Sequence, residues 1–453
     1  MRKLFGTDGI RGKANQFPMT AEMAMNLGRA VTYYFQKTNV NLEGKPLIIL
    51  GKDTRLSCYM LELAFSSGVC SQGGKVILTG PLPTPGVSFV TSNMRAHAGV
   101  MISASHNHYE DNGIKIFDGQ GNKLPDSIES EIEKMVLDPR LIKAAPGKEL
   151  GRAERLDEVI GRYIVQVKSC LDASISLEGL RIILDCANGA SYKVAPMIFS
   201  ELGADVFCIG TNPNGQNINL NVGSLHPQQA ALDVTKFKAE IGVCLDGDAD
   251  RVVIIDEKGE IIPGDILIGI LSKFALETGV INKGEEVVGT IMSNLALEKY
   301  IERLGLSFHR APVGDRYILE RMKVSNSNLG GEPSGHIIWP KISKTGDGIL
   351  SALKVIEAMK YFDKPLSQLR DEIQLYPQEI INVKVKNKTD FHKFPDIVDE
   401  VKKQELKLNG KGRVLLRYSG TESLARVMVE GESATLIAEA SESIAEVVEK
   451  CLG

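Results

Sequence analysis

Three carboxylates stand at alternate positions in one short stretch of this chain, Asp246-Gly247-Asp248-Ala249-Asp250-Arg251. Apolar, strand-like runs flank the stretch, at 241–245 before it and at 252–255 after it. Like charges this close repel one another, and each needs hydrogen bonds or a cation to stay ionised in a folded site. A hard divalent cation, Mg²⁺ or Ca²⁺, supplies that charge and prefers oxygen ligands. The pattern therefore predicts a metal site on a turn between two strands.

Two other interpretations of the acidic stretch compete with this one. A solvated acidic turn has the same composition and is about as common for an isolated motif of this kind. A calcium-binding helix–loop–helix also begins with alternate aspartates, and Glu257 even stands at its twelfth position. That loop needs Gly where this chain has Arg251, and its flanks are helices rather than strands. Mg²⁺ in phosphate chemistry, with few protein carboxylates and shared phosphate oxygens, fits better.

Length and composition limit the class of protein. A chain of 453 residues exceeds one hydrophobic core and predicts roughly three or four domains. The net charge of −4 argues against a broad surface for nucleic acid or membrane. No apolar run is as long as a membrane span, and the N-terminus lacks a signal-peptide core. Seven cysteines without a C-x-x-C pair favour a reduced, cytoplasmic protein.

Apolar runs that end in polar turns and open into helical periodicity recur along most of the chain. Examples of such runs are residues 47–50, 75–78, 182–184 and 287–291. Asn294, after the last of these, is expected to cap a helix. Alternating β and α elements favour mixed α/β layers, whose binding sites lie beyond the carboxyl ends of the strands.

The pattern changes after residues 363–377. Strand-like runs at 380–385, 414–417 and 424–429 are followed by a helical segment at 434–451. This ending predicts a small α+β domain that differs from the rest of the chain.

A serine-rich turn follows the apolar run at 99–102, with the sequence Ser103-Ala104-Ser105-His106-Asn107. A serine at such a turn exposes its hydroxyl while backbone N–H groups hold an anion nearby, so Ser105 is a candidate phosphoryl acceptor. Taken alone, the turn is more often a helix cap or a shaped loop. Lys115 is a candidate acid or base because the pKa of lysine falls readily near cations or on burial, although most lysines in such strands are solvated.

Three further loops combine glycine with polar side chains. Gly330–His336 offers a carboxylate, a hydroxyl and an imidazole suited to a polyol, and a Gly/Pro turn is the equal alternative. Residues 417–422 offer an arginine fork, hydroxyls and a glycine, which suits a phosphate, while an ordinary surface turn remains open. The N-terminal loop at 5–12 is rich in glycine but matches no P-loop.

Taken together and in this order, these clusters closely resemble the α-D-phosphohexomutase superfamily, over almost the whole chain. The resemblance implies an α/β fold with three similar mixed α/β domains and a smaller C-terminal α+β domain around a central active-site cleft. Each domain is expected to contribute one loop. The expected domains are residues 1–150 with the phosphoserine loop, 151–252 with the metal-binding loop, 253–370 with the sugar-recognition loop and 371–453 with the phosphate-binding loop.

The resemblance also assigns the site. It implies that Ser105 carries the transferable phosphoryl group and that one Mg²⁺ per active site is the cofactor. The implied metal ligands are Ser105, Asp246, Asp248 and Asp250. The residues implied near the transferring group are Lys115, His106, Arg251 and Arg11, with Thr7 in the same N-terminal loop. The implied substrate-binding residues are Glu332, Ser334, His336, Arg417, Ser419, Gly420 and Thr421.

Further stretches resemble the subgroup that acts on glucosamine phosphates. They are Asn217-Ile218-Asn219, Gly223-Ser224 with His226-Pro227, residues 289–294, and Thr345-Gly346-Asp347-Gly348. His108, Tyr418 and Ser423 replace common prolines and affect only loop stiffness. Pro333 stands where this subgroup usually has glutamine, and it bears on substrate preference.

The implied activity interconverts glucosamine 6-phosphate and glucosamine 1-phosphate through a phosphoserine and a bisphosphate intermediate, in the supply of amino-sugar nucleotides and cell-wall precursors. A phosphomannomutase/phosphoglucomutase with the same chemistry, a serine phosphatase on sugar phosphates and a catalytically silent sugar-phosphate sensor are the alternatives. The expected partners are a hexosamine phosphate and the bisphosphate, with no nucleic acid and no membrane. The sequence leaves a homodimer open.

Overall fold

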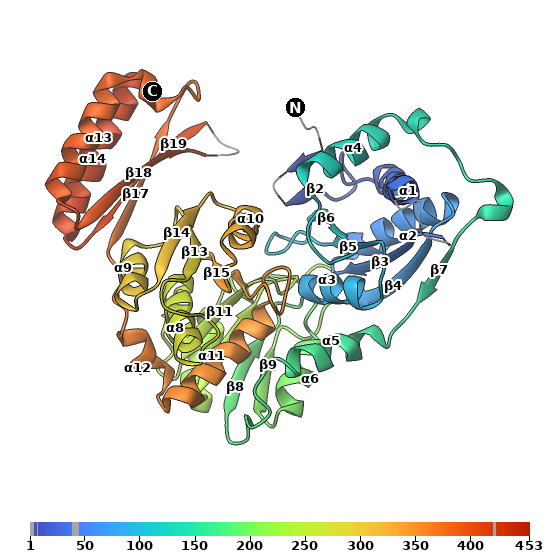
Figure 1. Ribbon diagram of the computed structural model, residues 1–453, viewed down its shortest axis with the longest axis horizontal. Helices are drawn as coiled ribbons and strands as arrows, with labels where there is room; N and C mark the ends of the chain where they lie inside the picture. Colours follow the sequence, from blue (N-terminus) through green and yellow to red (C-terminus); the bar gives the residue numbers. More distant parts are fainter. Residues whose placement is uncertain (1–3, 7, 39–44, 420–422) are drawn as a thin grey trace.

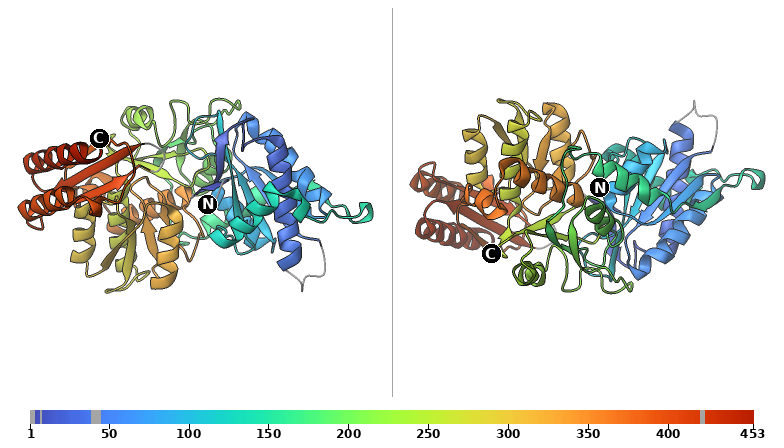
Figure 2. Two further views of the ribbon diagram at one scale, coloured as in Figure 1. Left: turned by 90° about the horizontal axis from the view of Figure 1, so that it is seen from above. Right: turned by 90° about the horizontal axis from the view of Figure 1, so that it is seen from below.

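Four β-sheets with packed helices make up the described part of the molecule (Figure 1). The computed structural model describes residues 4–6, 8–38, 45–419 and 423–453. We name each sheet with its helices a domain, from the first to the fourth in chain order. The first and fourth domains lie at opposite ends of the long axis, with the second and third between them (Figures 1 and 2).

The first domain has a seven-stranded sheet of order β1-β2-β6-β5-β3-β4-β7. Its strands are β1 (Phe5–Gly6), β2 (Gly9–Lys13), β3 (Leu47–Lys52), β4 (Lys75–Pro81), β5 (Ala98–Ile102), β6 (Asp111–Asp118) and β7 (Arg152–Arg155). Its helices are α1 (Ala21–Thr38), α2 (Leu56–Ser71), α3 (Thr84–Asn93) and α4 (Asp126–Leu137). Alternate residues of β3 enter different cores: Ile48 and Leu50 pack with α1 and α2, and Ile49 packs with α3. Because helices cover both faces, the strand is apolar throughout.

The second and third domains have five-stranded and four-stranded sheets. The second comprises α5 (Val159–Lys168), β8 (Arg181–Asp185), α6 (Val194–Glu201), β9 (Asp205–Ile209), α7 (Gln228–Phe237), β10 (Ile241–Leu245), β11 (Val252–Asp256) and β12 (Ile261–Ile262). The third comprises α8 (Gly264–Glu277), β13 (Glu286–Thr290), α9 (Leu295–Arg303), β14 (Ser307–Ala311), α10 (Asp315–Ser325), β15 (Leu329–Gly331), β16 (Ile337–Ile338), α11 (Gly348–Phe362) and α12 (Leu366–Asp371).

The first three sheets share one topology. Four strands in each sheet have the order fourth-third-first-second along the sheet: β6-β5-β3-β4, β11-β10-β8-β9 and β16-β15-β13-β14. Counted in chain order, the first three strands of each set are parallel to one another, and the fourth strand runs antiparallel to the third. The turn between the third and fourth strands therefore lies at the carboxyl edge of the parallel strands in all three domains.

The fourth domain is smaller and has its own core. Its antiparallel sheet has the order β17-β19-β18, with helices packed on it. Its elements are β17 (Gln378–Lys384), α13 (Pro395–Leu408), β18 (Gly412–Tyr418), β19 (Leu424–Gly431) and α14 (Ala434–Leu452). One continuous hydrophobic core joins one face of the first sheet to the second and third domains, whereas the fourth domain's buried hydrophobic residues form a separate cluster. The expected three similar α/β domains and smaller α+β domain are confirmed.

Polar contacts attach the fourth domain to the third. The Arg413 guanidinium donates to the carbonyl oxygens of Ile291 and Ser293, at 2.8 and 2.9 Å. The fully buried Glu430 of β19 accepts from the backbone N–H of Leu295, at 3.0 Å. Asn294 caps α9, as expected, by accepting from the backbone N–H of Ala296.

Two expected boundaries do not coincide with the sheets. β7 follows residue 150 yet pairs with β4 of the first sheet. β11 and β12 lie at or after residue 252 yet belong to the second sheet. The expected boundaries follow local changes in composition along the chain. Hydrogen bonds between strands do not depend on such changes, so the sheets extend past these boundaries. The boundaries themselves stay predictions.

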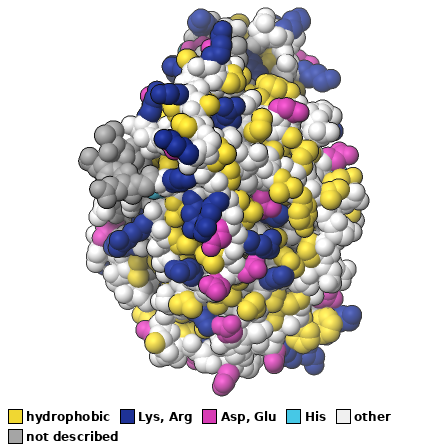
Figure 3. Space-filling view, turned by 90° about the vertical axis from the view of Figure 1, so that its right-hand side faces the viewer, with side chains coloured by type: hydrophobic (Ala, Val, Ile, Leu, Met, Phe, Trp, Pro, Cys, Tyr) yellow, Lys and Arg dark blue, Asp and Glu magenta, His cyan; other side chains and the backbone are white. Residues whose placement is uncertain are grey.

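The outer face of the first domain is mixed in character. Figure 3 shows Lys and Arg side chains scattered among Asp, Glu and hydrophobic side chains on this side of the molecule. Leu56, Tyr59 and Leu63 of α2 are large hydrophobic residues with more than half of their surface exposed. Among the helices of the described residues, none has the length and apolarity needed to cross a bilayer.

Candidate active site

Ser105 lies in the loop between β5 and β6, the third-to-fourth strand turn of the first domain. Its side chain is buried, and its Oγ donates a hydrogen bond of 2.6 Å to Asp246 Oδ2. The Nδ1 atom of His106 lies 3.3 Å from the same Oγ. The predicted phosphoryl carrier therefore contacts the first carboxylate of the acidic stretch, 141 residues away in sequence.

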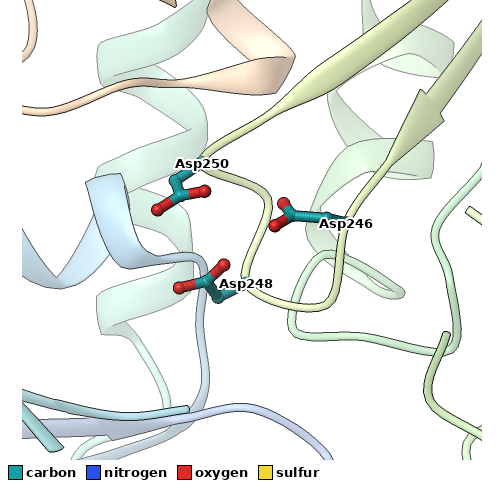
Figure 4. A group of neighbouring side chains, drawn as sticks. All are labelled: Asp246, Asp248 and Asp250. Carbon is teal, nitrogen blue, oxygen red and sulfur yellow. The ribbon is translucent and has the colours of Figure 1, made fainter. Parts of the chain in front are cut away.

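The three aspartates occupy the equivalent turn of the second domain, between β10 and β11. Their carboxylates point toward one another, with one oxygen from each within 4.8 Å of the others (Figure 4). All three side chains are buried, and Asp248 Oδ1 and Asp250 Oδ1 have no hydrogen-bond partner among the described residues. Unpartnered buried carboxylate oxygens that converge in this way fit a divalent cation.

Electrostatics support the same interpretation. Burial, followed by the negative charges of Asp250 and Asp248, raises the pKa of Asp246 well above its usual value. Burial also opposes ionisation of Asp250, but the positive charges of Lys115, His336 and Arg251 together outweigh it and hold the pKa of Asp250 well below its usual value. The nearby positive charge is therefore too small to favour the ionised form of Asp246, and a bound cation would supply more.

Close backbone approach makes this arrangement possible. A Cβ atom on Gly247 would lie 2.5 Å from the carbonyl oxygen of Ser105, so only glycine allows the two loops to meet there. Ala249, in the same turn, has a φ of +56°, a left-handed conformation that non-glycine residues seldom adopt. The glycine at position 247 is thus required by the close approach of the loop that carries Ser105.

Lys115 of β6 lies among carboxylates. Its Nζ is 3.0 Å from Asp248 Oδ2 and 3.2 Å from oxygens of both Asp250 and Asp8. The expectation that nearby cations or burial lower its pKa was wrong for this structure. Burial does oppose the charge, but the three carboxylates outweigh it and raise the pKa of Lys115 well above its usual value.

The other residues predicted near the transferring group lie at the same place. Burial, together with the Arg251 and Arg11 charges, lowers the pKa of His106 to about 4, so the imidazole is neutral at neutral pH. The backbone N–H of Arg251 donates to Asp246 Oδ1 at 3.2 Å. Arg11 of β2 forms an ion pair with Asp8. Thr7 lies outside the described residues.

A pocket of about 420 Å³ opens beside these groups and is shared by three domains. Its lining residues are Leu4, Gly6, Asp8, Gly9, Arg11 and His106 from the first domain, Asp250 and Arg251 from the second, and Val313, Gly314, Asp315, Glu332 and His336 from the third.

The predicted sugar loop is the third-to-fourth strand turn of the third domain, between β15 and β16. Glu332 lies in the pocket, and its Oε1 accepts from the backbone N–H of Gly314 at 3.1 Å. His336 is buried, with Nδ1 3.7 Å from Asp250 Oδ1, and its Nε2 accepts from the backbone N–H of Gly346. Ser334 is exposed and does not line this pocket. The turn therefore places two of its three predicted side chains at the pocket.

Arg417 and Ser419, two of the predicted phosphate-binding residues, lie at the end of β18 in the fourth domain. Arg417 is directly opposite Arg426 of β19, so both side chains are on one face of the sheet. Burial, followed by the Arg426 charge, lowers the pKa of Arg417. Ser419 is buried. Gly420 and Thr421 lie outside the described residues. Two neighbouring guanidiniums favour an anion at this strand end.

Thr84 and Lys123 complete the site, although no motif in the sequence marks either of them. Thr84, at the start of α3, donates from Oγ1 to Asp248 Oδ2 at 2.6 Å. Lys123 forms ion pairs with Asp8 of the N-terminal loop and Asp315 of α10. Thr84 follows the apolar run at 75–78, and Asp8 lies in the N-terminal loop at 5–12, but their partners Asp248 and Lys123 lie far away in sequence.

Comparison with known proteins agrees with this geometry. The chain matches four parts of the family described as phosphoglucomutase/phosphomannomutase: alpha/beta/alpha domain I at residues 2–141, domain II at 161–259, domain III at 263–376 and the C-terminal domain at 380–447. It is also 48% identical over 452 residues to the phosphoglucosamine mutase of Nitratidesulfovibrio vulgaris, a match that covers 100% of this chain and 99% of the relative.

The chain belongs to the phosphoglucosamine mutases of this family. As a phosphohexomutase it is an isomerase that acts by intramolecular phosphotransfer. Solved structures share the fold of this mutase family. One is a phosphoglucomutase/phosphomannomutase family protein from Burkholderia thailandensis, with a TM-score of 0.81, 20% identity and coverage of 99% of this chain and 98% of the other.

A second structure is the N-acetylphosphoglucosamine mutase of Aspergillus fumigatus in complex with GlcNAc-6P and magnesium. It has a TM-score of 0.70 at 16% identity and covers 100% of this chain and 96% of the other. At these identities the two structures demonstrate the shared fold alone.

Proposed function

We propose that this mutase interconverts glucosamine 6-phosphate and glucosamine 1-phosphate, with Ser105 as the phosphoryl carrier. The observation that supports this most directly is the 2.6 Å contact between Ser105 Oγ and Asp246, beside two further buried carboxylates and at a pocket lined by the sugar loop. A reusable hydroxyl, a cation site and a polyol-sized pocket are the parts that phosphoryl transfer to a sugar requires.

Two transfers complete the proposed reaction. The phosphorus–oxygen bond of phosphorylated Ser105 breaks as a new bond forms to the free hydroxyl of the substrate, which yields a hexosamine bisphosphate. The bisphosphate turns over, and its other phosphoryl group returns to Ser105 Oγ. The serine is phosphorylated again at the end, so the net change is the position of one phosphate.

Asp246, Asp248 and Asp250 would hold the Mg²⁺, together with an oxygen of the Ser105 phosphate. A bound cation would neutralise the negative charge on the oxygens of the phosphoryl group that is transferred. Asp248 Oδ1 and Asp250 Oδ1, which accept no hydrogen bond from the described residues, support this ligand set.

Proton transfer is assigned to Lys115 in this proposal. Its amine must be neutral to accept the proton of the sugar hydroxyl, and the charges of Asp8, Asp248 and Asp250 outweigh burial and favour the ammonium. Neutralising the carboxylates of Asp248 and Asp250 would therefore lower the pKa of Lys115 toward its working range. Arg11, Arg251 and the neutral His106 line the pocket and would stabilise the transferring phosphoryl group.

Substrate orientation is assigned to the other two loops. Glu332 and His336 would bind sugar hydroxyls in the pocket, with Ser334 on the same loop. Arg417, Ser419, Gly420 and Thr421 would hold the phosphate that is not transferred. Since either phosphate of the bisphosphate must fit there, this loop should recognise the phosphate and not the sugar.

Arg417→Ala is expected to weaken binding of glucosamine 6-phosphate by about 10- to 100-fold, because a charge-assisted hydrogen bond to an anion contributes about 1.5–3 kcal/mol. Titration calorimetry would measure the Kd. Lys407→Ala, at an exposed lysine of α13, is the control in the same domain. A change below threefold in Arg417→Ala would contradict the assignment.

Substrate preference separates this proposal from its alternatives. We expect kcat/KM for glucosamine 6-phosphate to exceed the values for glucose and mannose 6-phosphates in a coupled assay. A higher value for glucose or mannose would favour a phosphoglucomutase or phosphomannomutase. Release of inorganic phosphate faster than isomerisation would favour a phosphatase.

The setting of the enzyme is also proposed. All seven cysteines are free thiols in the structure, which suits the reducing cytoplasm. There its product would enter the synthesis of amino-sugar nucleotides and cell-wall precursors. A homodimer stays an open prediction.

A further inference from the structure

The serine loop is folded around one buried arginine. Arg55, directly before α2, has no exposed side-chain surface and pairs with Asp53, to whose Oδ2 its Nε donates at 2.8 Å. Its other four N–H groups donate to backbone carbonyl oxygens of the segment that follows β5. The acceptors are Ser105 and Asn107 at 2.9 Å each, Asp111 at 3.1 Å, and His108.

This set uses every donor of the guanidinium. Arginine has five N–H groups in a planar fork, and here one contacts a carboxylate, three contact the loop and one contacts the first residue of β6. A lysine offers three donors at one point and cannot reach the same acceptors. Asp53 also accepts from Ser103 Oγ at 2.6 Å, and Ser103 Oγ accepts from the backbone N–H of Ser105. The loop is therefore held at both ends of Ser105.

A second donor reaches the same loop from the neighbouring domain. Asn219 lies between β9 and α7 of the second domain and is 8% exposed. Its Nδ2 donates to the carbonyl oxygens of Ser105 and Asn107, at 2.9 and 3.0 Å. Each carbonyl oxygen thus accepts one bond from Arg55 and one from Asn219, which fills both of its lone pairs.

These contacts act on a strained residue. Ser105 has a φ of +53°, in the left-handed region that serine seldom occupies. Such a conformation persists only where surrounding contacts impose it. Without them we expect the backbone to relax and Oγ to move from Asp246.

We infer that Arg55 and Asn219 are positioning residues that hold the phosphoryl-carrying Ser105 against the acidic triplet from beneath its loop. Neither side chain is among those lining the pocket, so both act through the loop. The inference rests on the proposed function of Ser105. It also explains why the carrier in the first domain stays aligned with carboxylates in the second, because Asn219 joins the two.

The test compares two asparagines of one loop. Asn219 and Asn221 both have left-handed φ values, +59° and +54°, so glycine removes the side chain at either position without backbone strain. Asn221 is exposed and makes no side-chain hydrogen bond recorded for the described part of the chain. N221G is therefore the matched control for N219G, and R55K tests the arginine.

The measurement is the single-turnover rate constant for transfer from phosphorylated protein to glucosamine 6-phosphate. Each variant is first phosphorylated with glucosamine 1,6-bisphosphate and checked by intact mass. We expect a loss of about 10-fold or more in N219G and about 100-fold in R55K, since a displacement of about 1 Å in a reacting group can cost that much. N221G should stay within twofold. A rate constant is independent of the folded fraction, so simple destabilisation does not mimic the result.

A metal titration completes the experiment. Mn²⁺ binding to the unphosphorylated protein, followed by electron paramagnetic resonance, should change less than threefold in N219G because the three aspartates are untouched. Equal transfer rates in N219G and N221G would overturn the inference, whether or not R55K folds. Wild-type protein that cannot be phosphorylated on Ser105 would overturn the proposed function itself, which distinguishes the two failures.

Discussion

Ser105→Ala is expected to lower turnover of glucosamine 6-phosphate by at least roughly 10³-fold, as removal of a covalent nucleophile commonly does. The variant loses the Oγ that lies 2.6 Å from Asp246 and no other atom of the site. A coupled assay measures the loss, and intact mass should show that the variant no longer accepts phosphate from the bisphosphate.

Binding should survive in this variant. The Kd for glucosamine 6-phosphate is expected to stay within a few-fold of wild type, because the sugar and phosphate loops are unchanged. Ser127→Ala, at an exposed serine in the first turn of α4, controls for loss of a hydroxyl in the same domain. Activity of Ser105→Ala near the wild-type level would refute the covalent role.

Asp248→Asn is expected to weaken Mn²⁺ binding by on the order of 100-fold, which corresponds to about 2.7 kcal/mol. Asp248 Oδ2 accepts from Thr84 and Lys115, and its Oδ1 has no partner among the described residues. Asparagine has the same shape as aspartate but no negative charge. One of the two carboxylate oxygens becomes an NH₂ group, which donates hydrogen bonds and does not bind a cation. Electron paramagnetic resonance measures the affinity directly.

Turnover should depend on how much of the enzyme has metal bound. At low Mg²⁺ we expect activity of Asp248→Asn to fall by a similar factor and to recover in part as Mg²⁺ increases. Asp205→Asn, at an exposed carboxylate of the same sheet, should bind metal and turn over like wild type. If Asp248→Asn bound metal as tightly as the wild type, the triplet would not be the metal site.

Local patterns predicted the secondary structure well. The apolar runs at 47–50, 75–78 and 182–184 are the cores of β3, β4 and β8. The helix expected at 434–451 is α14. These predictions succeed because a strand buried on both faces is a continuous run of apolar residues. A helix buried on one face has apolar residues at the helical period.

The charge state of the site was harder to predict. Lys115 was expected to be a buried lysine with a lowered pKa, yet three carboxylates surround it and raise the pKa instead. Those carboxylates are Asp8, Asp248 and Asp250, which are up to 135 residues away in the chain. A pKa depends on neighbours in space, and no spacing within the sequence around residue 115 indicates them.

The residues beneath the serine loop show the same limit. Arg55 stands in an ordinary polar turn after β3, and Asn219 in a loop of the second domain. Their residue types are common in turns, so each invites a local explanation. Only the packed structure brings both to the carbonyl oxygen of Ser105.

By itself, the sequence determined the chemical inventory of this protein: an alternating aspartate triplet, a serine turn, polar glycine loops and the strands that precede them. The tertiary structure decided which of these meet. Three domains repeat one strand order, so the turns with Ser105, the aspartates and Glu332 occupy the same topological position and converge where the sheets pack together. Such convergence depends on packing between distant segments, which local periodicity does not encode.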